Sequence, residues 1–317
     1  MTDHQTGCFP SRAVVTGCSG LLGSNFVLRA QDSFQLAGFY GEHQVQIQGV
    51  ECLAVDLVSK VQVHEALDRL RPAILFHFAA RTNVDWCEDN KTATYRANVE
   101  GTQHLAAWAA KHGALLVFMS TDSVFDGMRG GYCESDLPAP LNIYARSKLE
   151  AEAAVKTVSP EHLIIRANIY GWNARKKLSL AEWILARLEA GQIVPGFTDA
   201  IFAPLLVNTL TEVLLKLVAK GARGTWHAAS RDAVSKYDFA TIIAQQFGFN
   251  AGRCEKTLAA KASFRAPRPL NTALDAGNLA TRYELIFPSV AEDIARFKAL
   301  RDQGYVAKLK NCCLADA

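Results

Sequence analysis

Short apolar segments that alternate with longer helical patterns are the feature that most restricts the fold of this chain. The apolar segments of the first half are continuous, which is typical of strands buried on both faces of a sheet. They read AVVTG, FQLAGFY, VECLAV, AILFHFAA, ALLVFMST and EHLIIRANIYG. Helical patterns occur at about 20–30, 59–70 and 90–112, and again in YARSKLEAEAAV. This order predicts an α/β fold with a doubly wound parallel sheet.

The regular alternation ends near residue 171. Beyond it the sequence predicts helices in SLAEWILARLEA, LVNTLTEVLLKLVAK and SKYDFATIIAQQFG, with a short strand in GTWHAA. The proline-rich RAPRPLN is expected to be extended or turned. We expect a first domain of residues 1–167, with 201–229 packing back onto it. Residues 168–200 and 230–317 are expected to form a smaller, mixed domain.

The composition excludes several classes of protein. Of the 317 residues 50% are hydrophobic and 21% are charged, a balance typical of globular domains. The net charge of +3 comes without a basic cluster, so we expect no nucleic-acid partner. The apolar runs are only as long as strands, and the opening MTDHQTGCFPSR lacks the apolar core of a secretory signal. We therefore expect no membrane span and no secretion.

The eight cysteines are scattered and form no C-x-x-C pair, which matches neither a zinc site nor a small disulfide framework. We expect reduced thiols, a cytoplasmic location and no metal site. A carboxylate-only metal site at a subunit interface would leave no motif, so that case stays open. The adjacent Cys312 and Cys313 have no expected role.

A glycine-rich turn follows the first predicted strand. VVTGCSGLLGSNF places Gly17, Gly20 and Gly23 between that strand and a helix, in the spacing G-x-x-G-x-x-G. Glycine permits a tight turn and close approach to the backbone, and the amides at a helix N-terminus attract a pyrophosphate. The sequence therefore predicts a Rossmann-like, dinucleotide-binding first domain. The contacts expected from this turn are Gly17, Ser19, Gly20, Leu21 and Leu22.

Two further strand ends bear on the cofactor. Asp56 ends ECLAVD and would accept a hydrogen bond from an adenine amine, with Leu57 beside it, or it would cap the next helix. Glu42 and His43 follow FQLAGFY, where an acidic residue favours NAD and a cation favours the 2′-phosphate of NADP. Since Glu42 lies beyond the expected position, the sequence leaves NADP(H) and NAD(H) open.

The segment NIYARSKLEAE places Tyr144 and Lys148 four residues apart, on one face of a predicted helix. Two interpretations fit this spacing. The pair is either a surface pair of an amphipathic helix or an acid–base pair, in which an ammonium group assists a phenol.

Five motifs in order carry a resemblance to the extended short-chain dehydrogenase/reductase family. They are TGCSGLLG, HFAARTNVDWCE, NVEGT, STDSVFDG and YARSK. More narrowly, AARTNVD, STDSVFDG, GYCESDLPAPLNIYARSKLEAE and RPLNTALD resemble the dTDP-4-dehydrorhamnose reductase family. The resemblance covers roughly Val14 to Asp275.

The resemblance implies a reductase with three catalytic side chains. Tyr144 would protonate a substrate carbonyl oxygen while a hydride arrives from the nicotinamide, since a phenol keeps its proton at neutral pH. Lys148 would stabilise the phenolate and hold the nicotinamide ribose. Thr121 would bond to the same carbonyl oxygen; alternatively its hydroxyl caps the turn after the strand. The smaller domain would bind the substrate.

Further contacts follow from the same resemblance. With the cofactor they are Ala79, Ala80, Asn98 and Asn168, besides the glycine turn, Tyr144 and Lys148. With the substrate they are Val84, Asp85, Asp122, Ser123 and Arg268. For Asn98 a structural bond to the backbone is the first expectation and a role in a water relay is the second. Alternatives are a solvated loop acid for Asp85 and a structural ion pair for Arg268.

Two departures from the family pattern concern the substrate. Ser123 replaces an aromatic residue, and FAPLLV replaces a G-x-P-T stretch. The first hypothesis is an NAD(P)H-dependent reductase of a keto group on a nucleotide-activated deoxysugar. The second is another sugar-nucleotide enzyme, although the Asp-Glu pair of 4,6-dehydratases is absent because Ser123 follows Asp122. The third is a non-catalytic subunit like the regulatory subunit of methionine adenosyltransferase. The sugar, the nucleotide and a possible homodimer stay open.

Overall fold

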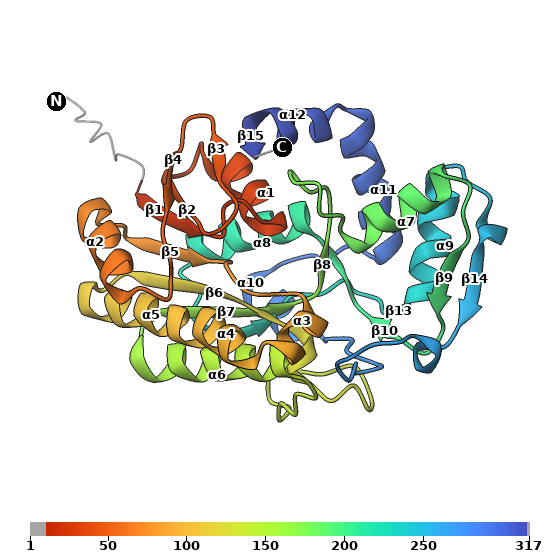
Figure 1. Ribbon diagram of the computed structural model, residues 1–317, viewed down its shortest axis with the longest axis horizontal. Coiled ribbons are helices and arrows are strands. Elements are labelled where there is room, and N and C mark those ends of the chain that lie inside the picture. Colours follow the sequence, from red (N-terminus) through yellow and green to blue (C-terminus); the bar gives the residue numbers. More distant parts are fainter. Residues whose placement is uncertain (1–10, 316–317) are drawn as a thin grey trace.

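The computed structural model describes residues 11–315, and the side chains of residues 11–311. The start of the predicted first domain at residues 1–10 and the side chains of Cys312 and Cys313 lie outside the described residues. Seven strands form a parallel sheet in the order β12-β7-β6-β5-β1-β2-β4 (Figure 1). They are β1 (Arg12–Thr16), β2 (Gln35–Tyr40), β4 (Glu51–Ala54), β5 (Ile74–His77), β6 (Leu115–Thr121), β7 (His162–Ala167) and β12 (Gly224–His227). The predicted α/β fold with a parallel sheet is confirmed.

Helices cover both faces of this sheet. On one face lie α2 (Lys60–Leu70), α5 (Gly101–His112) and α6 (Ile143–Val158); on the other lie α1 (Leu21–Ala30) and α8 (Val207–Ala219) (Figure 1). Successive side chains of a strand point to opposite faces, so both faces need apolar residues. In β1, Val14 belongs to the core beneath α2 and α5, and Val15 belongs to the core on the α1 side. The continuous apolar strands of the sequence follow from this double burial.

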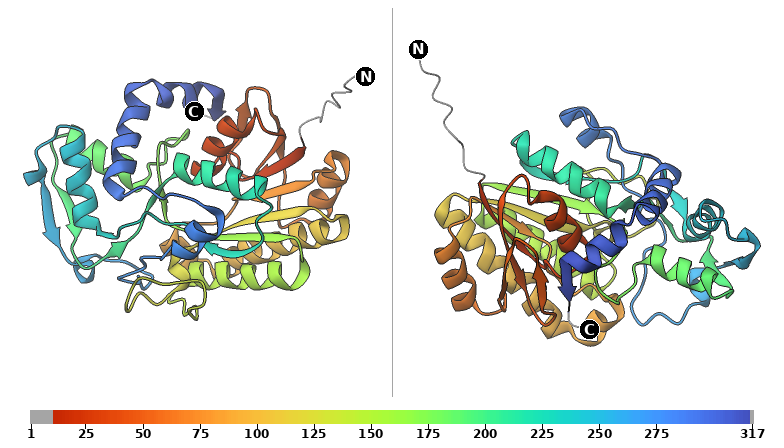
Figure 2. Two further views of the ribbon diagram at one scale, coloured as in Figure 1. Left: turned by 180° about the vertical axis from the view of Figure 1, so that it is seen from behind. Right: turned by 90° about the horizontal axis from the view of Figure 1, so that it is seen from above.

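The remaining strands form small two-stranded sheets. The pairs are β3 (Val45–Ile47) with β15 (Cys313–Ala315), β8 (Ile169–Tyr170) with β11 (Leu205–Leu206), β9 (Val194–Phe197) with β14 (Cys254–Thr257), and β10 (Ile201–Phe202) with β13 (Val234–Ser235). The other helices are α3 (Val84–Asp89), α4 (Lys91–Tyr95), α7 (Leu180–Glu189), α9 (Lys236–Gln246), α10 (Gly277–Tyr283), α11 (Val290–Asp302) and α12 (Tyr305–Cys312). Figure 2 shows α12 bringing the end of the chain back to α1.

The expected helical segment over 90–112 contains an irregular turn. A π-helical turn, Arg96–Glu100, separates α4 from α5. Such turns are rare in proteins, and many of those that do occur lie at functional sites. Here the turn contains Asn98, which is buried and bonds to the backbone of a neighbouring segment. The predicted helical segment 90–112 is confirmed, and the π-helical turn within it is a detail that the sequence did not predict.

The second half matches the expected helices and the extended proline-rich segment 265–271. Its core is aromatic: Trp172 stacks on Phe297 with ring centroids 4.0 Å apart, and Tyr170 meets Phe239 edge-on at 5.0 Å. Strand β12, from the segment 201–229, extends the parallel sheet beside β7. The domain boundaries themselves stay a prediction.

None of the helices described in this structure has the length and apolar character needed to cross a lipid bilayer.

A buried ion pair joins helix α6 to the sheet. Both oxygens of Glu152 accept hydrogen bonds from Arg166, at 2.9 and 2.7 Å, and Ser120 donates to the same carboxylate at 2.5 Å. The exposed fraction is 0% for Glu152 and 3% for Arg166. Each of the two buried charges is therefore stabilised by the other.

Replacing Glu152 by alanine is expected to lower the free energy of unfolding by about 3–5 kcal/mol, because it leaves the Arg166 guanidinium buried without its counter-ion. The matched control is Glu51→Ala, which breaks an exposed pair with Arg69 at 2.6 Å and should cost at most about 1 kcal/mol. Urea unfolding measures both. Equal losses in the two variants would contradict the prediction.

Candidate active site

The predicted site residues gather at the carboxyl ends of the parallel strands. Gly17 follows β1, Ala79 and Ala80 follow β5, Thr121 ends β6 and Asn168 follows β7. In parallel α/β sheets ligands bind in the crevice at this edge. Sequence positions far apart are thereby brought to one side of the sheet.

The glycine turn fits a bound dinucleotide. Gly17 has φ +69°, and a Cβ atom there would lie 2.8 Å from the backbone of Ala79. A Cβ atom at Gly23 would lie 2.1 Å from the Gly17 carbonyl oxygen, so neither position accepts a side chain. At the N-cap of α1, Gly20 supplies no side-chain cap, and the first turn holds no acidic residue. The first amides of α1 are therefore not capped by a side chain, as a pyrophosphate site requires.

Asn98 connects the segment after β5 to helix α6. Its Oδ1 accepts a hydrogen bond from Arg81 N at 2.7 Å, and its Nδ2 donates to Arg81 O at 3.2 Å and to Ser147 Oγ at 2.9 Å. Ser147 Oγ in turn donates to the Tyr144 carbonyl at 2.7 Å. The bond to the backbone was the first expectation for Asn98, and the structure confirms it. The residue acts on the site by holding two elements in place.

Tyr144 and Lys148 lie on α6, which begins at the N-cap Asn142. Burial raises the pKa of the Tyr144 phenol and nearby Asp122 raises it further, whereas a hydrogen bond with Thr121 lowers it. Burial lowers the pKa of Lys148 to about 7, and the Glu152 carboxylate opposes this shift. The Lys148 ammonium lies 4.0 Å from the centre of the Phe118 ring. At neutral pH Tyr144 thus carries its proton, and Lys148 is poised between its two states.

Thr121 fills one of the two roles that the sequence left open, the cap of the turn after its strand, and its bond to a substrate carbonyl stays a prediction. Its Oγ1 accepts a hydrogen bond from Ser123 N at 3.2 Å, which caps the short 3₁₀ turn Asp122–Val124. The same hydroxyl also interacts with Tyr144, as its effect on the phenol pKa requires. The strand-end cap therefore orients the hydroxyl toward the phenol.

The Asp122 carboxylate is buried and fully bonded by protein groups. Its Oδ1 accepts from Thr121 Oγ1 at 3.1 Å and from Ser123 Oγ at 3.2 Å. Its Oδ2 accepts from Asn168 Nδ2 at 2.9 Å and from Thr272 Oγ1 at 2.5 Å. These bonds join the ends of β6 and β7 to the extended segment around residue 272. Asp122 is therefore first of all a structural centre of the site.

The predicted substrate residues Asp85 and Arg268 contact each other. Arg268 Nη2 donates to Asp85 Oδ1 at 2.9 Å, and the same oxygen accepts from Ala266 N at 3.1 Å. The alternative of a structural ion pair for Arg268 therefore holds. Its second nitrogen, Nη1, is buried and has no hydrogen-bond partner among the described residues. Val84 begins α3 directly beside this pair.

Asp56 does not cap the helix that follows it. Its Oδ1 accepts from Val58 N at 3.0 Å, whereas the N-cap of α2 is Ser59, which accepts from Gln62 N. The helix-cap alternative for Asp56 was wrong because the chain makes one more turn before α2 begins. Leu57 packs against the start of α5. A Cβ atom added at Gly101 would lie 3.0 Å from the Cβ atom of Leu57.

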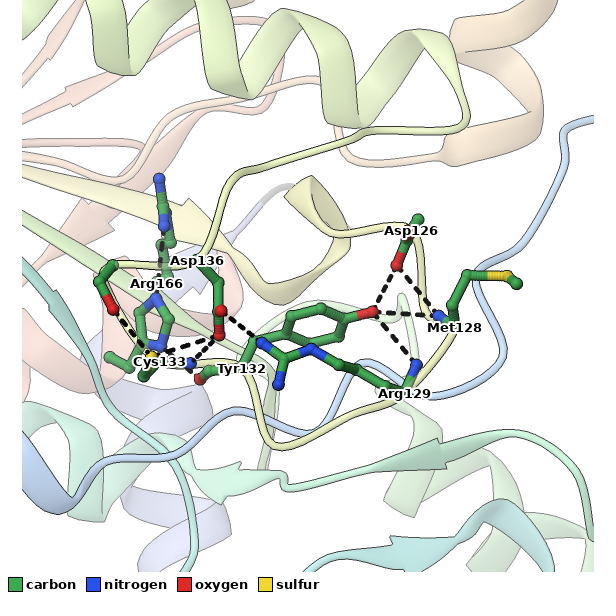
Figure 3. Close-up of polar contacts among 9 residues, drawn as sticks. Asp126, Met128, Arg129, Tyr132, Cys133, Asp136 and Arg166 are labelled. Carbon is green, nitrogen blue, oxygen red and sulfur yellow. Dashed lines mark hydrogen bonds and ion pairs between the residues drawn. The ribbon is translucent and has the colours of Figure 1, made fainter.

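The loop after β6 is held rigidly by Tyr132 (Figure 3). The Tyr132 hydroxyl donates to the Asp126 carboxylate and accepts from Met128 N at 3.0 Å. Its ring stacks on Phe125 with centroids 4.3 Å apart, and Arg166 lies 5.3 Å from the Phe125 ring. The segment that carries Ser123 is thus anchored on the buried Glu152–Arg166 pair.

Sequence reasoning missed two titratable residues beside the site. His77 ends β5 and lies between Thr16 Oγ1 at 2.7 Å and Thr102 Oγ1 at 2.9 Å. Lys236, at the start of α9, holds its ammonium 3.1 Å from the centre of the Phe202 ring. Burial lowers the pKa of Lys236 to about 7, while Asp122 acts in the opposite direction. Nothing local marks either residue, since His77 stands in an apolar strand and Lys236 at an ordinary helix start.

Among the described residues no group of three or more His, Cys, Asp or Glu side chains is arranged to hold a metal ion.

The fold and the chemistry at the strand ends place the chain among the NAD(P)-dependent oxidoreductases, in the extended short-chain dehydrogenase/reductase class. Within that class the family model "RmlD substrate binding domain" matches residues 11–301, and the chain belongs to this family. The predictions of the family and of an oxidoreductase are thereby confirmed.

Three similar proteins illustrate the range of the relatives. The probable low-salt glycan biosynthesis reductase Agl14 of Haloferax volcanii is 34% identical over 295 residues, covering 90% of this chain and 97% of that protein. Methionine adenosyltransferase 2 subunit beta of Pongo abelii is 28% identical over 288 residues, covering 85% and 82%. The crystal structure of dTDP-4-dehydrorhamnose reductase from Bacillus anthracis in complex with NADP has a TM-score of 0.82 at 26% identity, covering 92% of this chain and 99% of that one.

The free energy of unfolding is expected to fall as the pH drops below 6.5, in part because of His77. Burial, and then the nearby Lys148, lower the pKa of His77 to about 3, whereas the unfolded chain protonates this residue near 6.5. Between these values the unfolded state binds one more proton, so stability decreases by up to about 1.4 kcal/mol per pH unit.

Urea unfolding at pH 6.5 and pH 5, run on the wild type and on His77→Gln, measures this contribution. In the variant, the slope of the free energy of unfolding against pH should be smaller by the equivalent of about one proton. Identical slopes in the two proteins would mean that His77 is not held neutral in the native state.

Proposed function

We propose that this protein is an NAD(P)H-dependent reductase of the keto group of a nucleotide-activated deoxysugar. The observation that carries the proposal is the pairing of the Tyr144 phenol with the Thr121 hydroxyl at the strand ends, with Lys148 one helical turn away. A surface pair would be solvated and would leave both pKa values near their ordinary range. Burial instead shifts both, which supports the acid–base interpretation.

The three side chains then have distinct tasks. Tyr144 donates its proton to the carbonyl oxygen, and Thr121 orients the carbonyl by turning its hydroxyl hydrogen from Asp122 Oδ1 to the same oxygen. Bound NAD(P)H supplies the hydride to the carbonyl carbon. Lys148, when protonated, stabilises the phenolate left behind and holds the ribose hydroxyls of the cofactor. Asn98 is a positioning residue, since it fixes α6 against the segment after β5.

The cofactor would lie along the glycine turn. Its pyrophosphate would meet the amides of Gly20, Leu21 and Leu22, with Gly17 and Ser19 forming the turn. The adenine would reach Asp56 and Leu57. The small Ala79 and Ala80 leave room for the nicotinamide ribose, and Asn168 lies at the nicotinamide end. The relative from Bacillus anthracis holds NADP, which supports a nicotinamide dinucleotide here.

The substrate would bind on the side of the smaller domain. The buried Nη1 of Arg268 has a free hydrogen to offer a phosphate oxygen, and guanidinium groups bind phosphates well. Val84, Asp85, Asp122 and Ser123 would line this end of the crevice. The relatives named as reductases of a dTDP-sugar and of glycan biosynthesis support a nucleotide sugar. A cytoplasmic location and a possible homodimer remain part of the proposal.

A second candidate is a non-catalytic, cofactor-binding subunit. The similarity to methionine adenosyltransferase 2 subunit beta favours it. Under this proposal the glycine turn still binds a dinucleotide, while the partner is another protein subunit. A further sugar-nucleotide enzyme of the same class, such as an epimerase, would use the same Tyr144 and Lys148.

Changing Tyr144 to phenylalanine is expected to lower kcat by about 10²–10⁴-fold, because the variant lacks the proton that the carbonyl oxygen must receive. The assay follows NADPH and NADH consumption with a panel of nucleotide 4-keto-6-deoxysugars. Cofactor affinity should stay unchanged, and the partly exposed Tyr95→Phe serves as the matched control with normal turnover.

Cofactor binding without turnover of any sugar in the panel would contradict the reductase proposal and favour the binding subunit. Turnover that survives in Tyr144→Phe would show that another group donates the proton.

A further inference from the structure

The end of β2 carries a charge arrangement that the local sequence does not reveal. Glu42 lies two residues beyond β2 and was expected to favour NAD. In the structure Arg81, from the segment after β5, forms a two-pronged ion pair with it: Nη1 donates to Oε2 at 2.8 Å and Nη2 donates to Oε1. The Arg81 guanidinium also lies 5.2 Å from the Trp86 ring. Both oxygens of Glu42 are therefore already engaged.

A second segment approaches the same place from the other half of the chain. Residues 171–179, between β8 and α7, rise beside α1 (Figure 1). Asn25 of α1 donates to Trp172 O at 2.9 Å, which fixes the start of the segment. We call residues 171–179 the cationic strap, because its sequence GWNARKKLS carries three adjacent positive charges.

The strap has a defined shape, set by the buried Asn173. Its backbone N–H donates to Glu182 Oε1 at 3.0 Å, its Oδ1 accepts from Arg175 N at 3.1 Å, and its Nδ2 donates to Lys177 O at 2.8 Å. Ser179 Oγ closes the turn by donating to Gly171 O at 2.7 Å. The backbone positions of Arg175 and Lys177 are thus specified by hydrogen bonds within the fold.

The charges of the strap act on the residues that follow β2. Burial lowers the pKa of the His43 imidazole, and the positive charges of Arg175, Arg81 and Lys177 lower it further, whereas Glu42 raises it. Arg81 contacts this end of β2 directly through Glu42, and the charges of Arg175 and Lys177 act on it from the strap, against the single carboxylate of Glu42. Lys176, between the two strap cations, is exposed.

In a doubly wound fold the end of the second strand receives the ribose of the adenosine half. NAD recognition there needs a carboxylate free to accept the 2′-hydroxyl, and Arg81 already occupies the Glu42 carboxylate. A 2′-phosphate needs cations, and guanidinium groups bind it through charge-assisted, forked hydrogen bonds. We propose that Arg81, Arg175 and Lys177 form a binding site for the 2′-phosphate of NADP(H), which makes NADP(H) the preferred cofactor. This inference rests on the proposed use of a nicotinamide dinucleotide.

The test is direct binding, without any sugar substrate. Titration of nucleotide fluorescence gives Kd for NADPH and NADH with the wild type, with the double variant Arg175→Gln/Lys177→Gln, and with Lys176→Gln as the matched control. We expect the wild type to bind NADPH at least tenfold more tightly than NADH. The double variant should lose about tenfold or more in NADPH affinity, the size of a charge-assisted hydrogen bond.

NADH affinity reports whether the variants remain folded and whether the effect belongs to the 2′-phosphate. It should stay within about twofold in all three proteins, and Lys176→Gln should match the wild type with both cofactors. A wild type that binds NADH as tightly as NADPH would overturn the inference. So would a double variant that loses affinity for both cofactors alike, since the strap would then bind a part that they share. Loss of sugar turnover with NADPH selectivity intact would contradict the proposed reaction alone.

Discussion

The three hydrogen bonds of Asn98 are the connection on which the rest of the site depends. They tie the segment after β5 to α6, and so set the distance between the end of β5 and the helix that carries Tyr144 and Lys148. The amide is buried, where a satisfied hydrogen bond is strong and an unsatisfied one is costly. The same bonds fix the backbone of Arg81, whose side chain reaches Glu42 at the end of β2. The π-helical turn of residues 96–100 is the local irregularity that accommodates this residue.

Burial then sets the charge of each group around that connection. Tyr144 is held in its protonated form, because its ionised form would be desolvated next to Asp122. His77 remains neutral between two threonine hydroxyls, so Lys148 has no charged imidazole beneath it. The acids that are deeply buried, Asp122 and Glu152, have their oxygens bonded by protein donors. The protonation state of these groups is therefore set by burial and neighbouring charges more than by their ordinary pKa values.

Local patterns in the sequence were sufficient to predict the sheet, the glycine turn and the helix of Tyr144, because each depends on neighbouring residues. Side-chain pairs between distant segments were not predictable in this way. Arg268 meets Asp85 across 183 residues, and Arg81 meets Glu42 across 39. Periodicity contains no information on which of several arginines reaches a given acid. The Asp56 cap failed for a related reason, since the choice between Asp56 and Ser59 depends on one extra turn of backbone.

The two ends of the site are built from different kinds of contact. One end depends on buried hydrogen bonds, and the other depends on charged side chains outside the core. Thr121 at the end of β6, and Tyr144 and Lys148 on α6, are fixed by buried bonds within the parallel sheet and its helices. The charges that act on the end of β2 come instead from the half-buried Arg175 and the exposed Lys177 of the strap, which lie outside the hydrophobic core. The segment around Arg268 is held to the rest of the fold by its pair with Asp85, by the bond from Thr272 to Asp122, and by backbone hydrogen bonds with Gly127 and Ile201. Substitutions on the strap can therefore change the charge near the end of β2 without altering the buried contacts that position Tyr144.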